Sequence, residues 1–278
     1  MPSYLVTGAS RGLGFTFIDI LSQDPKNTVI GLVRDVASTV QKISAELPGR
    51  EGNKNLHIVQ GDLVDYESLK RSVDVVSSIL GNDGGLDYII ANGAIISKWS
   101  QYNGIGELAQ KSPRELEQDM LTSFQTNVIG NVHLFALYLP FTLRTTTKKI
   151  ITISTGFADL DLTRKYNLEA SAPYAVSKAA MNAVAAKFHA QYSEQGVLFL
   201  NICPGVVDTG VYEGATEEQM KAIMKQAEKF QAYADDFKGA ISPEESVTKI
   251  LQVVEKASLE DGYGGEFISH RGKGMKWL

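Results

Sequence analysis

Seven short apolar runs separated by amphipathic stretches constrain the fold of this 278-residue chain more than any other feature. Most of the runs are nearly continuous in apolar residues and rich in valine and isoleucine, as strands buried on both faces are. They cover residues 3–7, 28–33, 56–60, 86–91, 149–154, 197–203 and 265–269. Helical spacing of apolar side chains follows in residues 12–23, 65–80, 172–194 and 243–257. The alternation predicts an α/β fold of three layers (αβα), with a seven-stranded parallel sheet between helices.

The chain is expected to form a single domain, residues 1–278, because no internal repeat or low-complexity linker divides it. Two stretches interrupt the alternation. Residues 97–115 are polar and contain glycine before a helix resumes near Leu116, and residues 210–240 form a long insertion before a helix that starts near Pro243. Such excursions are often binding loops, so a substrate lid is expected at about 210–240.

Composition narrows the classes of function. The formal net charge is −5 and no basic patch is evident, which argues against nucleic acid as a partner. No apolar run is long enough to span a membrane, and the N-terminus lacks the pattern of a signal peptide, so a cytoplasmic location is expected. Cys203 is the only cysteine and is interpreted as a buried small hydrophobe. The four histidines show no ligand spacing, so no metal site is expected.

The first apolar run leads directly into the glycine-rich segment TGASRGLG, with Gly8, Gly12 and Gly14. Glycines are needed where a backbone turns sharply and approaches a pyrophosphate, and the helix that follows offers free N–H groups to the anion. A strand before the loop and a helix after it strengthen this interpretation. The sequence therefore predicts a dinucleotide site at this loop.

The spacing of these glycines resembles the TGxxxGxG segment of the short-chain dehydrogenase/reductase family, and the resemblance extends from Thr7 to the last strand near Phe267. It implies a Rossmann-like fold. It also implies cofactor contacts from the glycine loop and from the turns that follow later strands. Those residues are Gly8, Ser10, Arg11, Gly12, Leu13, Gly14, Asp62, Leu63, Asn92, Gly93, Pro204, Gly205, Val207 and Thr209. ANGA (91–94) departs from the family's NNAG but keeps small residues.

The nicotinamide cofactor is expected to be NADP(H). The residue about twenty positions after the last glycine of the loop contacts the adenosine ribose. Arg34 stands there, and Arg11 adds a second positive charge, so both guanidinium groups suit a 2′-phosphate. The alternative is that Arg34 faces solvent and Asp35, the next residue, selects NAD.

The strongest chemical signal is Tyr174-Ala-Val-Ser-Lys178. Residues four apart share one face of a helix, so Lys178 is expected beside the Tyr174 hydroxyl. A neighbouring ammonium group lowers the pKa of a tyrosine and lets it exchange a proton with a carbonyl or alcohol near neutral pH. Both residues are also implied to contact the cofactor.

The resemblance adds two further groups. The family's serine, which holds the substrate oxygen, aligns with Thr155, and Ser154 is the alternative because neighbouring strand residues face opposite sides. Asn127 matches an asparagine that holds a water connecting the lysine to solvent. The segment from Thr155 to Tyr174 is longer than in typical members, so residues 157–172 are expected to form an extra loop.

Together these features imply an NADP(H)-dependent carbonyl reductase or alcohol dehydrogenase acting on a small-molecule ketone, aldehyde or secondary alcohol. Two alternatives stay open: a non-redox member of the fold, such as a cofactor-binding regulator or an enzyme with a repurposed pocket, and an NAD-linked alcohol dehydrogenase. An apolar or aromatic substrate is suggested by the aromatic residues near the site, which are Phe157, Tyr212, Phe230, Tyr233 and Phe237.

The resemblance also implies a homodimer or homotetramer. Relatives commonly pair the helix equivalent to 172–194 with the one near 116–138 across a two-fold axis. The surface of the first helix is expected to be mostly small or apolar, formed by Ala180, Ala183, Val184, Lys187, Phe188 and Gln191. The loop at 157–172 could instead cover that surface and leave a monomer.

Overall fold

The computed structural model describes residues 1–278 except 48, 51 and 211–212. Seven strands form one sheet in the order β3-β2-β1-β4-β5-β6-β7, and every neighbouring pair is parallel. The strands are β1 (Ser3–Thr7), β2 (Thr28–Val33), β3 (Leu56–Gln60), β4 (Tyr88–Ala91), β5 (Lys149–Ile153), β6 (Leu198–Cys203) and β7 (Phe267–Ser269). The predicted α/β class and the seven-stranded parallel sheet are confirmed.

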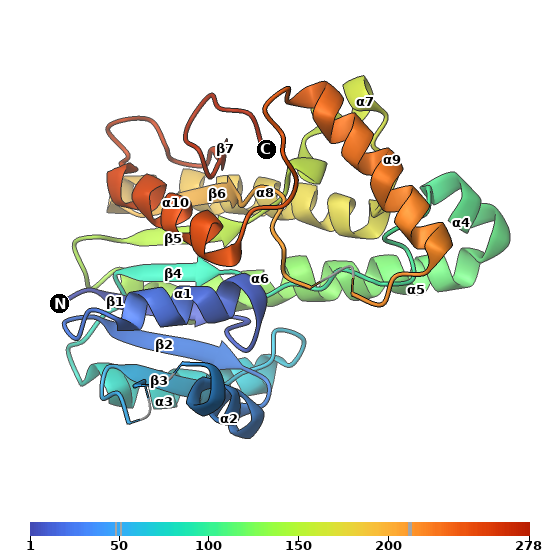
Figure 1. The fold of residues 1–278 in the computed structure, drawn as a ribbon. Coiled ribbons are helices and arrows are strands. Elements are labelled where there is room, and N and C mark those ends of the chain that lie inside the picture. Colours follow the sequence, from blue (N-terminus) through green and yellow to red (C-terminus); the bar gives the residue numbers. More distant parts are fainter. Residues whose placement is uncertain (48, 51, 211–212) are drawn as a thin grey trace.

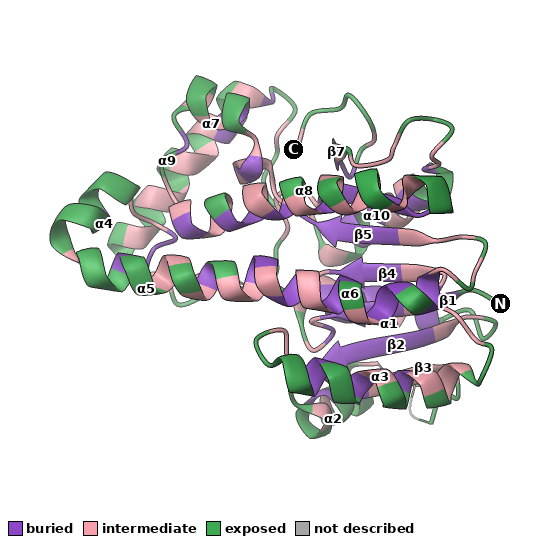
Figure 2. Ribbon diagram, turned by 180° about the vertical axis from the view of Figure 1, so that it is seen from behind, coloured by how far each residue is buried: buried purple, intermediate pink, exposed green. Residues whose placement is uncertain are grey.

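Helices cover both faces of the sheet (Figure 1, Figure 2). One core lies between the sheet and the helices α1 (Gly12–Ser22), α2 (Val36–Glu46) and α10 (Pro243–Lys256). The other lies beneath α3 (Tyr66–Leu80), α6 (Gly130–Thr142) and α8 (Ala172–Tyr192). No helix in the described part of the chain is both long and apolar enough to cross a membrane.

Two stretches that were expected to be irregular contain short helices. Residues 97–115 include α4 (Ile105–Lys111), and α5 (Pro113–Phe124) begins at Pro113 rather than near Leu116. Proline suits the first turn of a helix, where its missing N–H would have no partner. The expected loop at 157–172 contains α7 (Leu160–Tyr166), whose first turn is capped by the Asp159 carboxylate.

A π-helical turn, Gln125–Ile129, joins α5 to α6. The helix predicted near 116–138 is therefore longer than expected and has a local irregularity at its middle. Such turns often occur at functional sites because they redirect one side chain out of the regular helical pattern. The residue placed here is Asn127, which is fully buried.

The strand order reverses between β1 and β4, which are paired neighbours in the sheet. From β1 the chain adds β2 and β3 toward one edge, and from β4 it adds β5, β6 and β7 toward the other edge. In open parallel sheets, ligands bind in the crevice that this reversal leaves beyond the carboxyl ends of the strands. Gly8 and Asn92 follow these two ends, so the fold brings the predicted cofactor segments to this crevice.

Candidate active site

The glycine loop after β1 is packed so tightly that a side chain would not fit at Gly8 or at Gly14. Gly8 and Gly12 have φ angles of 66° and 53°, in the left-handed region that favours glycine. A Cβ on Gly14 would lie 2.2 Å from the carbonyl oxygen of Gly8. Because only hydrogen fits there, the start of α1 closes directly onto the turn.

The loop after β4 lies against the glycine loop. The Asn92 side-chain amide donates to the Thr7 carbonyl at 3.0 Å, and the Gly93 N–H donates to the Thr7 hydroxyl at 2.9 Å. A Cβ on Gly8 would lie 2.7 Å from the Gly93 Cα, so larger residues would separate the two backbones. The departure from NNAG therefore preserves the close approach that a bound dinucleotide requires.

Two further segments border the same crevice. The methyl group of Thr209, after β6, would lie 3.5 Å from a Cβ on Gly12, and Gly205 turns the chain with a φ of 85°. The Ser246 hydroxyl donates to the Pro204 carbonyl at 2.7 Å, which holds this turn in place. On the opposite edge, Leu63 touches Gly93, since a Cβ there would lie 3.0 Å from the leucine Cδ1.

Asp62, Ser10, Leu13 and Val207 complete the predicted cofactor contacts. Asp62 is half-buried after β3, and its carboxylate accepts from the Val64 N–H at 3.2 Å. Leu13 and Val207 line the same cavity as Tyr174, and Val207 forms a parallel bridge with Ile241. Ser10 lies inside the glycine loop between Gly8 and Gly12 and is half-buried. The tight glycine cradle and its neighbours fit a nicotinamide dinucleotide.

The two arginines proposed for the adenosine end are both exposed. Arg34 follows β2 directly, and Arg11 precedes α1. Among the described residues neither guanidinium forms an ion pair. The Asp35 carboxylate accepts from the Ser38 N–H at 3.1 Å and caps α2, and this hydrogen bond lowers its pKa.

Tyr174 and Lys178 lie one turn apart on α8. The Lys178 side chain is buried, and its Nζ donates to the Ile153 carbonyl at 2.6 Å and lies 5.8 Å from the centre of the Tyr174 ring. Burial lowers the pKa of Lys178 to about 8, so the ammonium still carries its charge at neutral pH. This arrangement places a cation beside the tyrosine in surroundings of low polarity, where it acts strongly.

Ser154 and Thr155 both line the cavity that contains Tyr174, but their hydroxyls have different partners. The buried Ser154 hydroxyl donates to the Asn182 side-chain carbonyl at 2.7 Å. The Thr155 hydroxyl accepts from the Phe157 N–H at 3.3 Å, and no acceptor for its proton is found among the described residues.

Asn127 connects the segment before α4 to α8 through hydrogen bonds. Its side-chain carbonyl accepts from the Ile95 N–H at 2.8 Å, and its amide donates to the Ile95 carbonyl at 3.0 Å and to the Ser177 hydroxyl at 2.9 Å. Ser177 lies between Tyr174 and Lys178 in the sequence. The π-helical turn therefore places the Asn127 side chain against α8, the helix that carries Tyr174 and Lys178.

A cavity of about 210 Å³ opens in front of Tyr174. Several side chains that form its walls were not predicted from the sequence, and most come from distant parts of the chain. These are Ile96, Leu162, Cys203, Val206, Gln226, Trp277 and Leu278. Burial raises the pKa of Cys203 to about 11, so its thiol stays protonated, and its interpretation as a buried small hydrophobe is confirmed.

Trp277 holds the C-terminal segment against this cavity. Its indole N–H donates to the Asp159 carboxylate at 2.7 Å, and its ring stacks on Phe267 with centres 4.3 Å apart. The only signal in the sequence was a large aromatic residue in the C-terminal segment RGKGMKWL. Such a residue is rarely left without a packing partner.

The aromatic residues expected near the substrate separate into two groups. Phe157 and Phe230 line the cavity, with ring centres 5.9 Å apart. Tyr233 and Phe237 pack into a small apolar cluster with Leu162 and Phe230 instead. Tyr212 lies outside the described residues. The insertion at 210–240 contains α9 (Glu217–Tyr233), which carries Gln226 and Phe230 into the cavity wall.

Comparison with known proteins decides the family. The family model for short chain dehydrogenases matches residues 3–220. The chain belongs to the short-chain dehydrogenase/reductase family. It is 54% identical to the short chain dehydrogenase virK of Hypocrea virens and 45% identical to the short-chain dehydrogenase/reductase iacC of Pestalotiopsis fici, each over 100% of both chains.

Solved structures agree with this assignment. The NADPH-bound carbonyl reductase from chicken fatty liver superimposes with a TM-score of 0.75 at 25% identity, covering 100% of this chain and 99% of that one. Members of the family use nicotinamide cofactors, and this short-chain dehydrogenase/reductase is an oxidoreductase of that kind. The predicted family and the Rossmann-like fold are both confirmed.

Proposed function

We propose that this short-chain dehydrogenase/reductase is an NADP(H)-dependent carbonyl reductase or alcohol dehydrogenase that acts on a ketone, an aldehyde or a secondary alcohol. The observation that carries the proposal is the buried Lys178 ammonium behind the Tyr174 ring, at a cavity that Thr155 also lines. A proton donor, a cation that activates it and a second hydroxyl thus meet at one apolar cavity, as carbonyl reduction requires.

Each group has a role that follows from its surroundings. The nicotinamide, when bound, supplies the hydride that adds to the substrate carbon. Tyr174 gives its hydroxyl proton to the substrate oxygen, and the charge on Lys178 stabilises the phenolate left behind. Thr155 donates its hydroxyl proton to the same oxygen and fixes its position. Asn127 acts through Ser177 and Ile95 by holding α8 in register, and a water held there would resupply protons.

The choice of NADP(H) rests on the adenosine end. Two exposed arginines flank the place where the ribose of a dinucleotide binds in this fold, and a guanidinium binds phosphate through paired charged hydrogen bonds. The Asp35 carboxylate already caps α2, which makes it a poorer acceptor for a ribose hydroxyl. The chicken carbonyl reductase is also bound to NADPH.

Reduction is the proposed direction of the reaction, since NADPH is the reductant of biosynthetic and detoxifying reactions in the cytoplasm. The cytoplasm is therefore also the proposed location of the protein. The whole chain, 1–278, is proposed to act as one catalytic domain, with α9 as the lid. Because α9 supplies Gln226 and Phe230 to the cavity wall, its position controls which substrates reach Tyr174.

The test is a panel of aromatic and aliphatic aldehydes and ketones, with oxidation of NADPH and NADH followed by absorbance. Turnover with NADPH and a clear preference over NADH is expected. A preference for NADH would favour the NAD-linked alcohol dehydrogenase. Tight NADPH binding without turnover of any carbonyl or alcohol would favour a non-redox member of the fold.

A homodimer or homotetramer is also proposed. Three of the α8 residues named for the contact, Ala183, Lys187 and Gln191, are exposed, whereas Ala180, Val184 and Phe188 pack on the core. The neighbouring helix α5 adds Leu121 and Phe124, which are 58% and 41% exposed. The helix α7 packs against α9 and leaves this surface uncovered.

Light scattering at micromolar concentration should give a mass of at least twice the 30.3 kDa of the chain. Replacing Leu121 with glutamate should shift the mass toward the monomer, because a charge would be buried in an apolar contact between copies. A monomer in the unmodified protein would contradict the proposal.

A further inference from the structure

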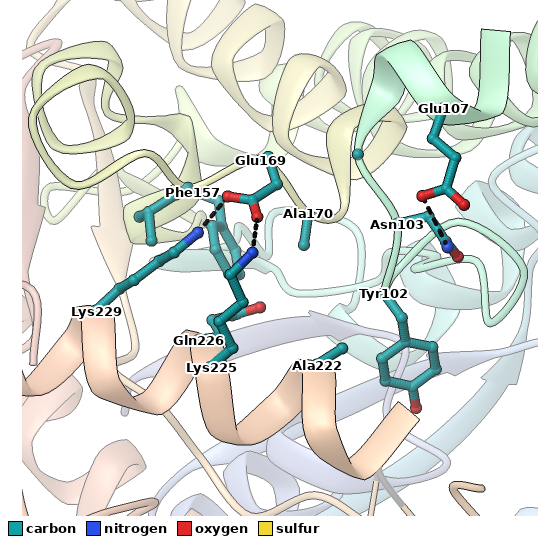
Figure 3. A pocket seen from close by; sticks show the side chains of 12 residues that line it. Tyr102, Asn103, Glu107, Phe157, Glu169, Ala170, Ala222, Lys225, Gln226 and Lys229 are labelled. Atoms are coloured by element: carbon teal, nitrogen blue, oxygen red, sulfur yellow. Dashed lines mark hydrogen bonds and ion pairs between the residues drawn. The ribbon is translucent and has the colours of Figure 1, made fainter. Parts of the chain in front are cut away.

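A second cavity, of about 290 Å³, lies beside α9 and has a different chemistry from the catalytic one (Figure 3). It is bounded by α9, by the start of α4 and by residues 168–170. Seven of its twelve lining residues are polar or charged: Tyr102, Asn103, Glu107, Glu169, Lys225, Gln226 and Lys229. Ala170 and Ala222 supply small side chains that leave the space open.

The two cavities share part of their walls. Phe157 and Gln226 line both the catalytic cavity and this second one. Phe157 comes from the turn after β5 and Gln226 from α9, so these two side chains lie where the two cavities adjoin. A ligand that fills the catalytic cavity and extends past Phe157 would therefore enter the second cavity.

The charges in the second cavity are already paired. Lys225 donates to the Glu169 carboxylate at 3.1 Å, and Lys229 donates to its other oxygen (Figure 3). Burial raises the pKa of Glu169, but the hydrogen bonds from Lys229 and Lys225 outweigh it and lower the pKa to about 2. Glu107 is paired with Lys111 at 2.8 Å.

This pairing limits what the cavity can bind. An anionic ligand would have to compete with Glu169 for its lysines, and a cationic one would compete with the lysines for the carboxylate. Side chains that both donate and accept hydrogen bonds, namely the Tyr102 hydroxyl and the Asn103 and Gln226 amides, line the same space. A neutral hydroxyl group can use such partners without disturbing the ion pairs.

We propose that the second cavity binds the hydroxyl-bearing end of an elongated carbonyl substrate whose apolar body occupies the catalytic cavity. The substrate class is thus a neutral, amphiphilic aldehyde or ketone, with Phe157 and Gln226 contacting it at the passage between the cavities. This inference rests on the proposed carbonyl reduction and adds the part of the protein that selects the substrate.

The test compares benzaldehyde with two series of para-alkoxybenzaldehydes of increasing chain length, ended either by a hydroxyl group or by a methyl ether. Once the chain passes Phe157, the hydroxyl-ended compound should have a KM about three- to tenfold lower than its methyl-ended counterpart, the usual effect of one or two hydrogen bonds. For shorter chains the two series should have equal KM values.

Ala222→Phe tests the location, because the added ring fills the second cavity. It should bring the KM ratio of the two long compounds close to one. The matched control is Met224→Phe on the same helix, where the side chain is 64% exposed and lies outside both cavities. The control should keep the full ratio and the turnover of benzaldehyde.

Equal KM values for the two series at every length, or the same loss of the ratio in both variants, would overturn the inference. Failure of the proposed function is a separate result, in which benzaldehyde itself is not reduced. In that case calorimetric affinities of the same compounds decide: a hydroxyl advantage that Ala222→Phe removes supports the binding site, and no such advantage refutes it.

Discussion

Replacing Tyr174 with phenylalanine is expected to lower turnover by about a hundredfold or more, the usual contribution of a positioned proton donor. The ring is kept, so its packing against the Lys178 side chain and the wall of the cavity changes little. Only the hydroxyl, and with it the proton for the substrate oxygen, is lost. Steady-state rates with a carbonyl substrate of the wild type measure the effect.

The affinity for NADPH, measured by fluorescence titration, should stay within a few-fold of the wild-type value in this variant. An equal loss of affinity and turnover would indicate that the tyrosine mainly binds cofactor. Wild-type turnover in Tyr174→Phe would contradict the assignment of the proton donor altogether.

The second large effect is expected at the adenosine end, in Arg34→Asp. The substitution removes a guanidinium from the proposed 2′-phosphate contact and puts a carboxylate in its place. Since hydrogen bonds to charged groups contribute about 1.5–3 kcal/mol, NADPH should bind tenfold to a hundredfold more weakly. NADH, which lacks the phosphate, should be affected less or should bind better.

Arg164→Asp is a suitable control because it makes the same change of charge at an 81% exposed side chain on α7. That variant should leave both affinities near the wild-type values. If NADPH and NADH lose affinity equally in Arg34→Asp, Arg34 does not discriminate between the cofactors, and the Asp35 alternative regains support.

The strands could be predicted from the sequence because each is an apolar run whose neighbours cover both of its faces. All six residues of β6, for example, are buried. The short helices could not be predicted in the same way. Only Leu162 of the seven residues of α7 is buried, so α7 shows no clear helical period of apolar residues.

The same distinction applies to the candidate site. The glycine loop and the Tyr174–Lys178 pair are local motifs, so their geometry follows from a turn or from one helical turn. The pairs Trp277–Asp159 and Asn127–Ile95 join residues 118 and 32 positions apart. Such contacts depend on how the elements pack in space, and no spacing in the sequence indicates them. The second cavity was missed for the same reason.

The burial of the Lys178 ammonium affects the free energy of unfolding of the whole chain. In the folded protein its pKa is about 8, whereas an unfolded chain keeps the ordinary value of 10.5. Between these pH values the unfolded chain therefore binds one more proton than the folded protein. As the pH rises through this range, the free energy of unfolding increases and the folded state becomes more stable. Below pH 8 the buried ammonium costs the native state on the order of 3 kcal/mol. At neutral pH the folded protein is thus less stable because it keeps a buried charge at the place of the proposed proton transfer.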